Sequence, residues 1–88
     1  MKISIWDTQV NREDGLIMYF EIVVPMNITN EKTICAYGKE YLKKKVFRTN
    51  EMSSSKCSFC QIESRSSHII GQIHSVGYSI VEIENCNA

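Results

Sequence analysis

Two β-rich stretches near the amino terminus, residues 2–10 and 16–24, flank a polar segment that contains Asp14-Gly15. An Asp-Gly step favours a tight hairpin turn because glycine adopts a positive φ without steric cost. The second stretch turns a purely apolar face to one side, which predicts that this face meets the core. It ends at Pro25, since proline lacks the amide hydrogen that a ladder needs. The predicted core residues of this strand are Met18, Phe20, Ile22 and Val24.

The next segment has the spacing of an amphipathic helix that begins after Thr29 or Asn30, either of which can cap it, and ends near Lys45. Its apolar side carries Ile34, Gly38, Tyr41 and Leu42. A glycine inside a helix costs about 1 kcal/mol relative to alanine. We therefore expect a neighbouring element to pack closely against Gly38.

The second half of the chain is less periodic. Residues 48–56 are polar and rich in serine, which predicts a surface loop. Residues 57–63 form a short strand candidate. Residues 66–77 predict a helix that a serine caps and a glycine closes. The β-branched residues of 78–84 predict a last strand.

These elements predict a single α+β domain over residues 1–88, in the order β-β-α-β-α-β. We expect one mixed sheet of about four strands with two helices packed on one face. Crossovers between parallel neighbours should be right-handed.

Composition narrows the function classes. With 43% hydrophobic and 23% charged residues the chain is an ordinary globular sequence, and ten basic residues balance ten acidic ones. A nucleic-acid partner is disfavoured, because such binders normally carry a basic excess. One basic cluster with two aromatic residues could face RNA or an acidic partner, or could simply solvate the end of a helix. Its members are Lys39, Tyr41, Lys43, Lys44, Lys45, Phe47 and Arg48.

The start of the chain reaches Asp7 before any apolar run long enough for a signal peptide. No stretch has the roughly 18 apolar residues that cross a bilayer. We expect a cytoplasmic protein without a membrane partner, in which the cysteines are free thiols or metal ligands.

The clearest local motif is the pair Cys57 and Cys60, because two thiolates at this spacing can hold a zinc ion if the backbone turns between them. Cys86 and one histidine, His74 in our proposed set, would complete four ligands. His68 lies six positions from His74, about 120° around the helix, so the two histidines do not readily share an ion.

Two other interpretations of the pair remain open. A thioredoxin-type redox role requires the first cysteine at a helix amino terminus, whereas the predicted helix starts several residues later. The simplest interpretation is two small buried thiols that pack beside Phe59.

No catalytic motif accompanies these cysteines. The sequence contains no nucleophile elbow, no zinc-protease helix motif and no glycine-rich phosphate loop. The sequence therefore favours a non-enzymatic protein.

Four segments, residues 7–10, 14–25, 57–61 and 77–87, carry a resemblance to a known family. Together they resemble the bacterial domain-of-unknown-function family two thousand and twenty-four. The resemblance covers nearly the whole chain and implies a compact α/β fold of a small cytoplasmic protein without an established activity. The family often has histidine after the second cysteine and glycine before the last one, where this chain has Gln61 and Asn85. Both departures weaken a metal interpretation.

The sequence thus predicts a binding or interaction module for a protein or small molecule, with self-association left open. The alternative is a small zinc protein that uses Cys57 and Cys60.

Overall fold

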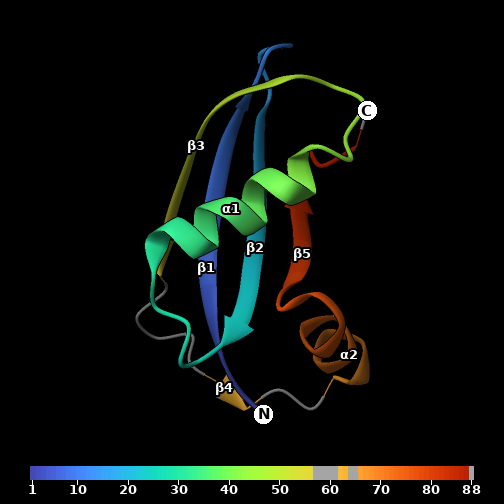
Figure 1. The fold of residues 1–88 in the computed structure, drawn as a ribbon. Coiled ribbons are helices and arrows are strands. Elements are labelled where there is room, and N and C mark those ends of the chain that lie inside the picture. Colours follow the sequence, from blue (N-terminus) through green and yellow to red (C-terminus); the bar gives the residue numbers. More distant parts are fainter. Residues whose placement is uncertain (57–61, 64–65, 88) are drawn as a thin grey trace.

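A computed structural model describes residues 1–56, 62–63 and 66–87 of the chain. It confirms the α+β class and the predicted order of the main elements (Figure 1). A further strand of two residues, β4, precedes the second helix. The elements are β1 (Lys2–Arg12), β2 (Ile17–Pro25), α1 (Glu31–Leu42), β3 (Thr49–Lys56), β4 (Ile62–Glu63), α2 (Ser67–Val76) and β5 (Ser79–Glu84).

The strands form one sheet in the order β3-β1-β2-β5, and β4 pairs with the first residues of β1. Every pairing among the described strands is antiparallel, so the expectation of a mixed sheet was wrong. The reason lies in the position of β1. Strands β2 and β3, which α1 connects, run in the same direction, but β1 lies between them and pairs with both.

The predicted β1–β2 hairpin is confirmed. Gly15 has φ +90°, and its amide donates to the Arg12 carbonyl at 3.1 Å. Val10 faces Met18 in the register, and Trp6 faces Ile22. The predicted core face of β2 is fully buried.

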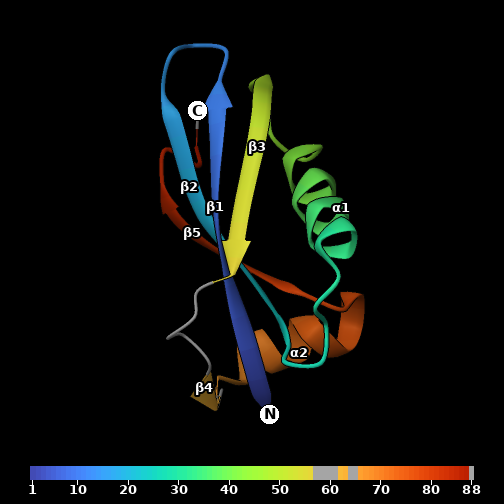
Figure 2. The same ribbon diagram turned by 90° about the vertical axis from the view of Figure 1, so that its left-hand side faces the viewer.

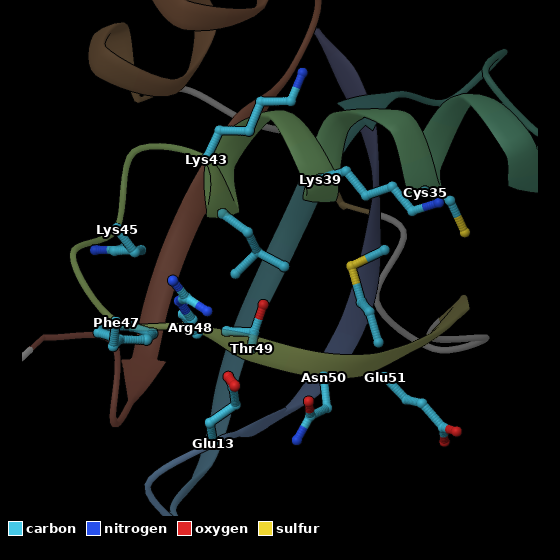
Figure 3. Close-up of a pocket in the computed structure, with 12 residues that line it drawn as sticks. Glu13, Cys35, Lys39, Lys43, Lys45, Phe47, Arg48, Thr49, Asn50 and Glu51 are labelled. Atoms are coloured by element: carbon cyan, nitrogen blue, oxygen red, sulfur yellow. The ribbon is translucent and has the colours of Figure 1, made fainter.

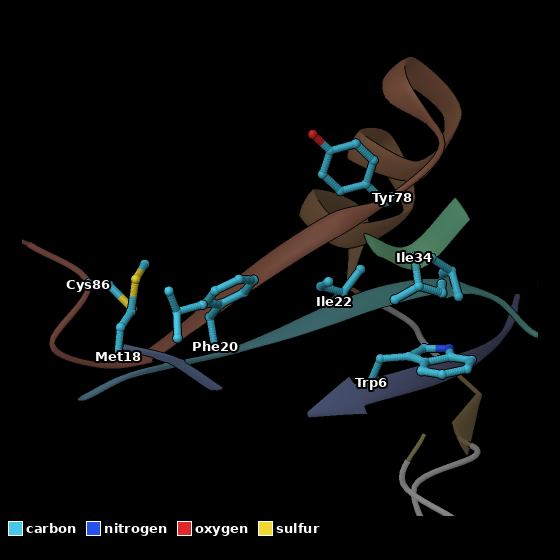
Figure 4. Packing of buried hydrophobic residues seen from close by; sticks show 9 residues of the cluster. Trp6, Met18, Phe20, Ile22, Ile34, Tyr78 and Cys86 are labelled. Carbon is cyan, nitrogen blue, oxygen red and sulfur yellow. The ribbon is translucent and has the colours of Figure 1, made fainter. Parts of the chain in front are cut away.

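Helix α1 covers this face of the sheet (Figure 2). Asn30 caps it by accepting a hydrogen bond from the Lys32 amide at 2.8 Å. The expected close approach at Gly38 is confirmed, because an added Cβ there would lie 2.7 Å from Met52 Sδ and 3.3 Å from Ile22 Cδ1. The core under the helix is shown in Figure 4 and includes Trp6, Met18, Phe20, Ile22, Ile34, Tyr78 and Cys86.

Helix α2 has the predicted caps, Ser66 and the left-handed Gly77, but packs on the opposite side of the sheet. Its Ile73 forms a second buried cluster with Ile3 and Val23. Ile3 and Val23 alternate with the residues under α1, so they belong to the other face. The prediction that both helices share one face was wrong, because Val23 and Ile3 form a second apolar area on the other face of the sheet, near one end.

Strand β3 lies where a surface loop was expected. It pairs with β1 from Arg12 opposite Thr49 to Trp6 opposite Lys56. An edge strand is held by backbone hydrogen bonds and needs few apolar side chains, which is why its polar sequence suggested a loop. Of the strand predicted at 57–63, residues 62–63 form β4 and the rest lies outside the described residues.

Candidate functional site: the groove between α1 and β3

Of the predicted zinc ligands, Cys57 and Cys60 lie outside the described residues. Cys86 is buried, and its thiol donates to the Tyr19 carbonyl at 3.1 Å. His74 is exposed on α2, which lies at the opposite end of β5 from Cys86 (Figure 1). The structure therefore does not bring Cys86 and His74 together, and the zinc site stays a prediction.

Within residues 1–56, 62–63 and 66–87, no group of three or more histidine, cysteine or acidic side chains is arranged to hold a metal ion. None of the helices in the same ranges is long and apolar enough to cross a bilayer.

A concave site with a volume of about 860 Å³ lies between α1 and β3 (Figure 3). We call it the α1–β3 groove. Its apolar lining includes Leu42 and Met52, both half-buried, and Phe47. Its polar lining residues are Glu13, Cys35, Lys39, Lys43, Lys45, Arg48, Thr49, Asn50 and Glu51.

The fold places the basic residues of the groove on two different elements. Lys39 lies in the last turns of α1, and Lys43 follows the helix as its C-cap. Arg48 directly precedes β3, and its carbonyl accepts a hydrogen bond from the Glu13 amide at 3.1 Å. Lys39 and Arg48 therefore lie at the same opening between the helix and the strand, whereas the Lys43 side chain extends over the other side of α1, away from β3 (Figure 3).

Lys45 is occupied by a neighbouring carboxylate. Its ammonium lies 2.6 Å from Glu82 Oε2, and the Tyr41 hydroxyl donates to the same oxygen. These two bonds, with that from Lys45 the stronger influence, lower the pKa of Glu82. Burial, followed by the bond to Glu82, raises the pKa of Tyr41. This network neutralises Lys45 and ties the segment after α1 to β5.

The other basic residues are less engaged. Lys43 is 3.7 Å from Glu40, and both side chains are largely exposed. An exposed pair of this kind contributes about 0–1 kcal/mol. In the described part of the chain, no ion pair engages Lys39 or Arg48. Two cationic side chains, Lys39 and Arg48, are thus available to a ligand in the α1–β3 groove.

The Phe47 ring packs against the guanidinium of Arg12. The buried guanidinium of Arg12 lies 3.7 Å from the centre of the Phe47 ring. It also donates to the Asp14 carboxylate and to the carbonyls of Asn85 and Asn87, at 3.0 and 2.8 Å. The bond from Arg12 is the main cause of the lowered pKa of Asp14. This contact set holds one wall of the groove and the carboxyl-terminal tail together.

A second concave site, of about 420 Å³, lies between the end of α1, α2 and β5. It contains His68 and Lys44, and also the bonded Tyr41, Lys45 and Glu82. Because most of its charged groups already satisfy one another, it offers a ligand less than the α1–β3 groove does.

The fold and the groove define a small α+β domain in which a helix overlies the edge strand of an antiparallel sheet. The chain belongs to the family Domain of unknown function (DUF2024), whose model matches residues 1–83. This confirms the resemblance found in the sequence. No curated protein and no solved structure matches the chain.

The sequence identified the basic residues but not the groove. Residues 48–56 were interpreted as a loop, so the sequence indicated no strand that could form a groove with the helix that carries Lys39. The one trace of β3 in the sequence is Met52, an apolar residue in a serine-rich segment that now packs beneath Gly38.

Proposed function

We propose that this protein is a non-enzymatic binding module whose ligand site is the α1–β3 groove, and that its ligand is anionic. The observation that carries the proposal is the combination of an apolar lining with two available cations, Lys39 and Arg48, in one cavity of about 860 Å³. Ligand sites are typically concave, largely apolar and supplied with a few convergent polar groups.

The chemistry of the cations favours carboxylate or phosphate groups. The guanidinium of Arg48 can bind either group with two parallel hydrogen bonds, and the ammonium group of Lys39 adds attraction without fixed geometry. Two acidic residues, Glu13 and Glu51, also line the groove, and both lie on the side of β3 that faces away from α1 (Figure 3). The side of the groove beneath the helix is therefore basic.

Nuclear magnetic resonance titration of the isotope-labelled chain tests this proposal. The panel contains glutarate, citrate, inorganic phosphate and short acidic peptides. We expect backbone shifts concentrated at residues 39–43 and 48–52. Arg48→Gln should weaken binding, whereas Lys44→Gln, the same loss of one charge outside the groove, should leave it unchanged. The proposal fails if no member of the panel binds more tightly than about 10 mM, or if the shifts map elsewhere.

A further inference from the structure

We infer that the side of the sheet away from α1 docks a basic segment of a partner protein, and that one arginine of this segment enters a hollow beside Tyr19. The inference goes beyond the proposed function, because this hollow shares no lining residue with the α1–β3 groove. Three observations carry it: an uncovered sheet face, an acidic pair without a cation, and a hollow with an aromatic wall.

The sheet side away from α1 is largely uncovered. Helix α1 lies on one side of the sheet (Figure 2), and α2 packs on the other side at the end that carries Ile3 and Val23. Beyond that end, Ile17 and Tyr19 of β2 are 39% and 37% exposed. A solvated face of an antiparallel sheet is normally polar, so two neighbouring apolar side chains depart from the usual pattern. We call this surface the open sheet face, and its residues are Asp7, Gln9, Ile17, Tyr19, Glu21, Ser53 and Ser55.

The charge of the open sheet face is negative and unbalanced. Asp7 on β1 lies directly opposite Glu21 on β2, and like charges in such a cross-strand pair are destabilising. Burial, with a smaller effect of Asp7, raises the pKa of Glu21. Among the described residues no ion pair engages either carboxylate, and the open sheet face contains no lysine, arginine or histidine. A partner that supplies a cation would relieve this repulsion.

A hollow lies directly beside the acidic pair. It has a volume of about 170 Å³, and Asp7, Gln9 and Tyr19 contribute to its lining, together with Ser53 and Ser55. In the register Gln9 lies between Tyr19 on β2 and Ser53 on β3, so a large ring borders one side and a small hydroxyl borders the other. Arginine suits this arrangement, because its planar guanidinium can bond a carboxylate with two parallel hydrogen bonds and stack on an aromatic ring. Asp7 and Tyr19 would supply these two groups.

Ile17 extends the surface beyond the hollow. It lies two residues from Tyr19 on the same face of β2, which corresponds to a separation of about 6.5 to 7 Å. An apolar side chain next to the arginine of the partner can therefore contact Ile17 while the arginine occupies the hollow. A metal ion or a small amine would leave this apolar side chain exposed. The observations therefore favour a protein segment that combines arginine with apolar residues.

The probe is an N-acetylated, C-amidated hexapeptide in which arginine alternates with leucine, titrated into the isotope-labelled chain. We expect nuclear magnetic resonance shifts concentrated at residues 7–9, 17–21 and 53–55. The matched control peptide carries citrulline in place of arginine, which keeps the shape and the hydrogen-bond donors but removes the charge. It should bind at least about tenfold more weakly, because three charges are lost and each exposed charge pair contributes about two- to fivefold.

Matched variants of the protein test the acidic pair and the ring separately. Asp7→Asn and Glu21→Gln should each weaken binding of the arginine peptide by about two- to fivefold. Tyr19→Leu keeps an apolar side chain but removes the ring, and it should weaken binding by a similar factor. Glu31→Gln removes one charge from the first turn of α1, outside the open sheet face, and should leave the affinity unchanged.

Several results would overturn the inference. It fails if the citrulline peptide binds as tightly as the arginine peptide, if the shifts map elsewhere, or if binding is weaker than about 10 mM. It also fails if calcium alone moves the Asp7 and Glu21 signals and displaces the peptide, because the acidic pair would then be a metal site. Self-association of the chain that Tyr19→Leu abolishes would show that a second copy occupies this face. The proposed function is tested separately, since small anions should shift residues 39–43 and 48–52.

Discussion

Replacing Arg12 by methionine should release the carboxyl-terminal tail before it unfolds the protein. The Arg12 guanidinium, which is buried, donates hydrogen bonds to the carbonyls of Asn85 and Asn87 on either side of Cys86. Methionine retains much of the side-chain length and apolar contact but removes every one of these donors. The tail would then be held by the burial of Cys86, its bond to Tyr19, and the bond that the Asn85 side chain donates to the Ile17 carbonyl at 2.7 Å.

The size of the effect follows from the bonds that are lost. Hydrogen bonds to a charged group contribute about 1.5 to 3 kcal/mol. The tail carbonyls of Asn85 and Asn87 lie near solvent and regain water when the donor is removed, so we assign this amount to both bonds together. At about 1.4 kcal/mol for each factor of ten, the open state of the tail should become roughly 10- to 150-fold more populated.

Cysteine alkylation measures this opening directly. The Cys86 thiol is 4% exposed and reacts only when the tail opens, whereas Cys35 is half-buried and unconnected to Arg12. A short pulse of iodoacetamide followed by peptide mass spectrometry gives the two rates in one sample. In Arg12→Met the Cys86 rate should rise by the factor above, while the Cys35 rate stays constant. Arg48→Met, which removes an exposed arginine, serves as the control.

Two results would refute this reasoning. If Arg12→Met lowers the midpoint of urea unfolding but Cys86 reacts at the wild-type rate, the arginine stabilises the fold without holding the tail. If Cys35 and Cys86 accelerate together, the variant opens globally. Arg12→Lys should lie close to Arg12→Met, because lysine keeps the charge but lacks the planar fork that bonds Asp14 and both carbonyls.

Three further predictions concern packing, charge and metal. Gly38→Ala should gain about 1 kcal/mol of stability in a Met52→Ala background but clearly less in the wild type, because the added Cβ would lie 2.7 Å from Met52 Sδ; equal effects in both backgrounds would rule out this contact. Burial, with a smaller effect of Asp7, raises the pKa of Glu21 in the folded state, so its ionised form opposes folding above that pKa. Glu21→Gln should therefore stabilise the protein at pH 7 by a few tenths of a kcal/mol, since exposure screens the effect, and thermal melts should show this gain disappearing below the unfolded-state pKa of about 4.3. If the predicted cysteine-pair zinc site forms, elemental analysis of protein purified without chelator should find about one zinc per chain, and a metal-free result would remove that alternative.

Much of the fold was predictable because its signals are local. The Asp14-Gly15 turn and the apolar alternation of β2 each follow from neighbouring residues, and both are confirmed. The caps Asn30 and Ser66 are equally local. Strand β3 was missed because its stability comes from pairing with β1, which no pattern within residues 49–56 expresses. The placement of α2 depended on Val23, whose apolar character was visible but whose partner was not.

The candidate site was harder to predict because it is formed by two segments whose contact depends on the sheet order. Lys39 and Arg48 were recognised as basic residues near aromatics, which is compatible with an ordinary solvated helix end. Only the strand order places β3 at the edge and α1 above it. The cysteine pair, in contrast, was the clearest motif in the sequence, and the described part of the chain leaves it untested.

A solvated helix end explains part of the basic cluster but not all of it. Lysines in the last turn stabilise the negative end of a helix by about 0.3 to 1 kcal/mol, which accounts for Lys39 and Lys43 without any ligand. Arg48 lies beyond the helix, immediately before β3, where the helix dipole does not stabilise its charge. It is exposed and nevertheless lines the same groove. Because Arg48 lines the same groove as Lys39, a binding role accounts for its position, whereas the helix-end explanation does not.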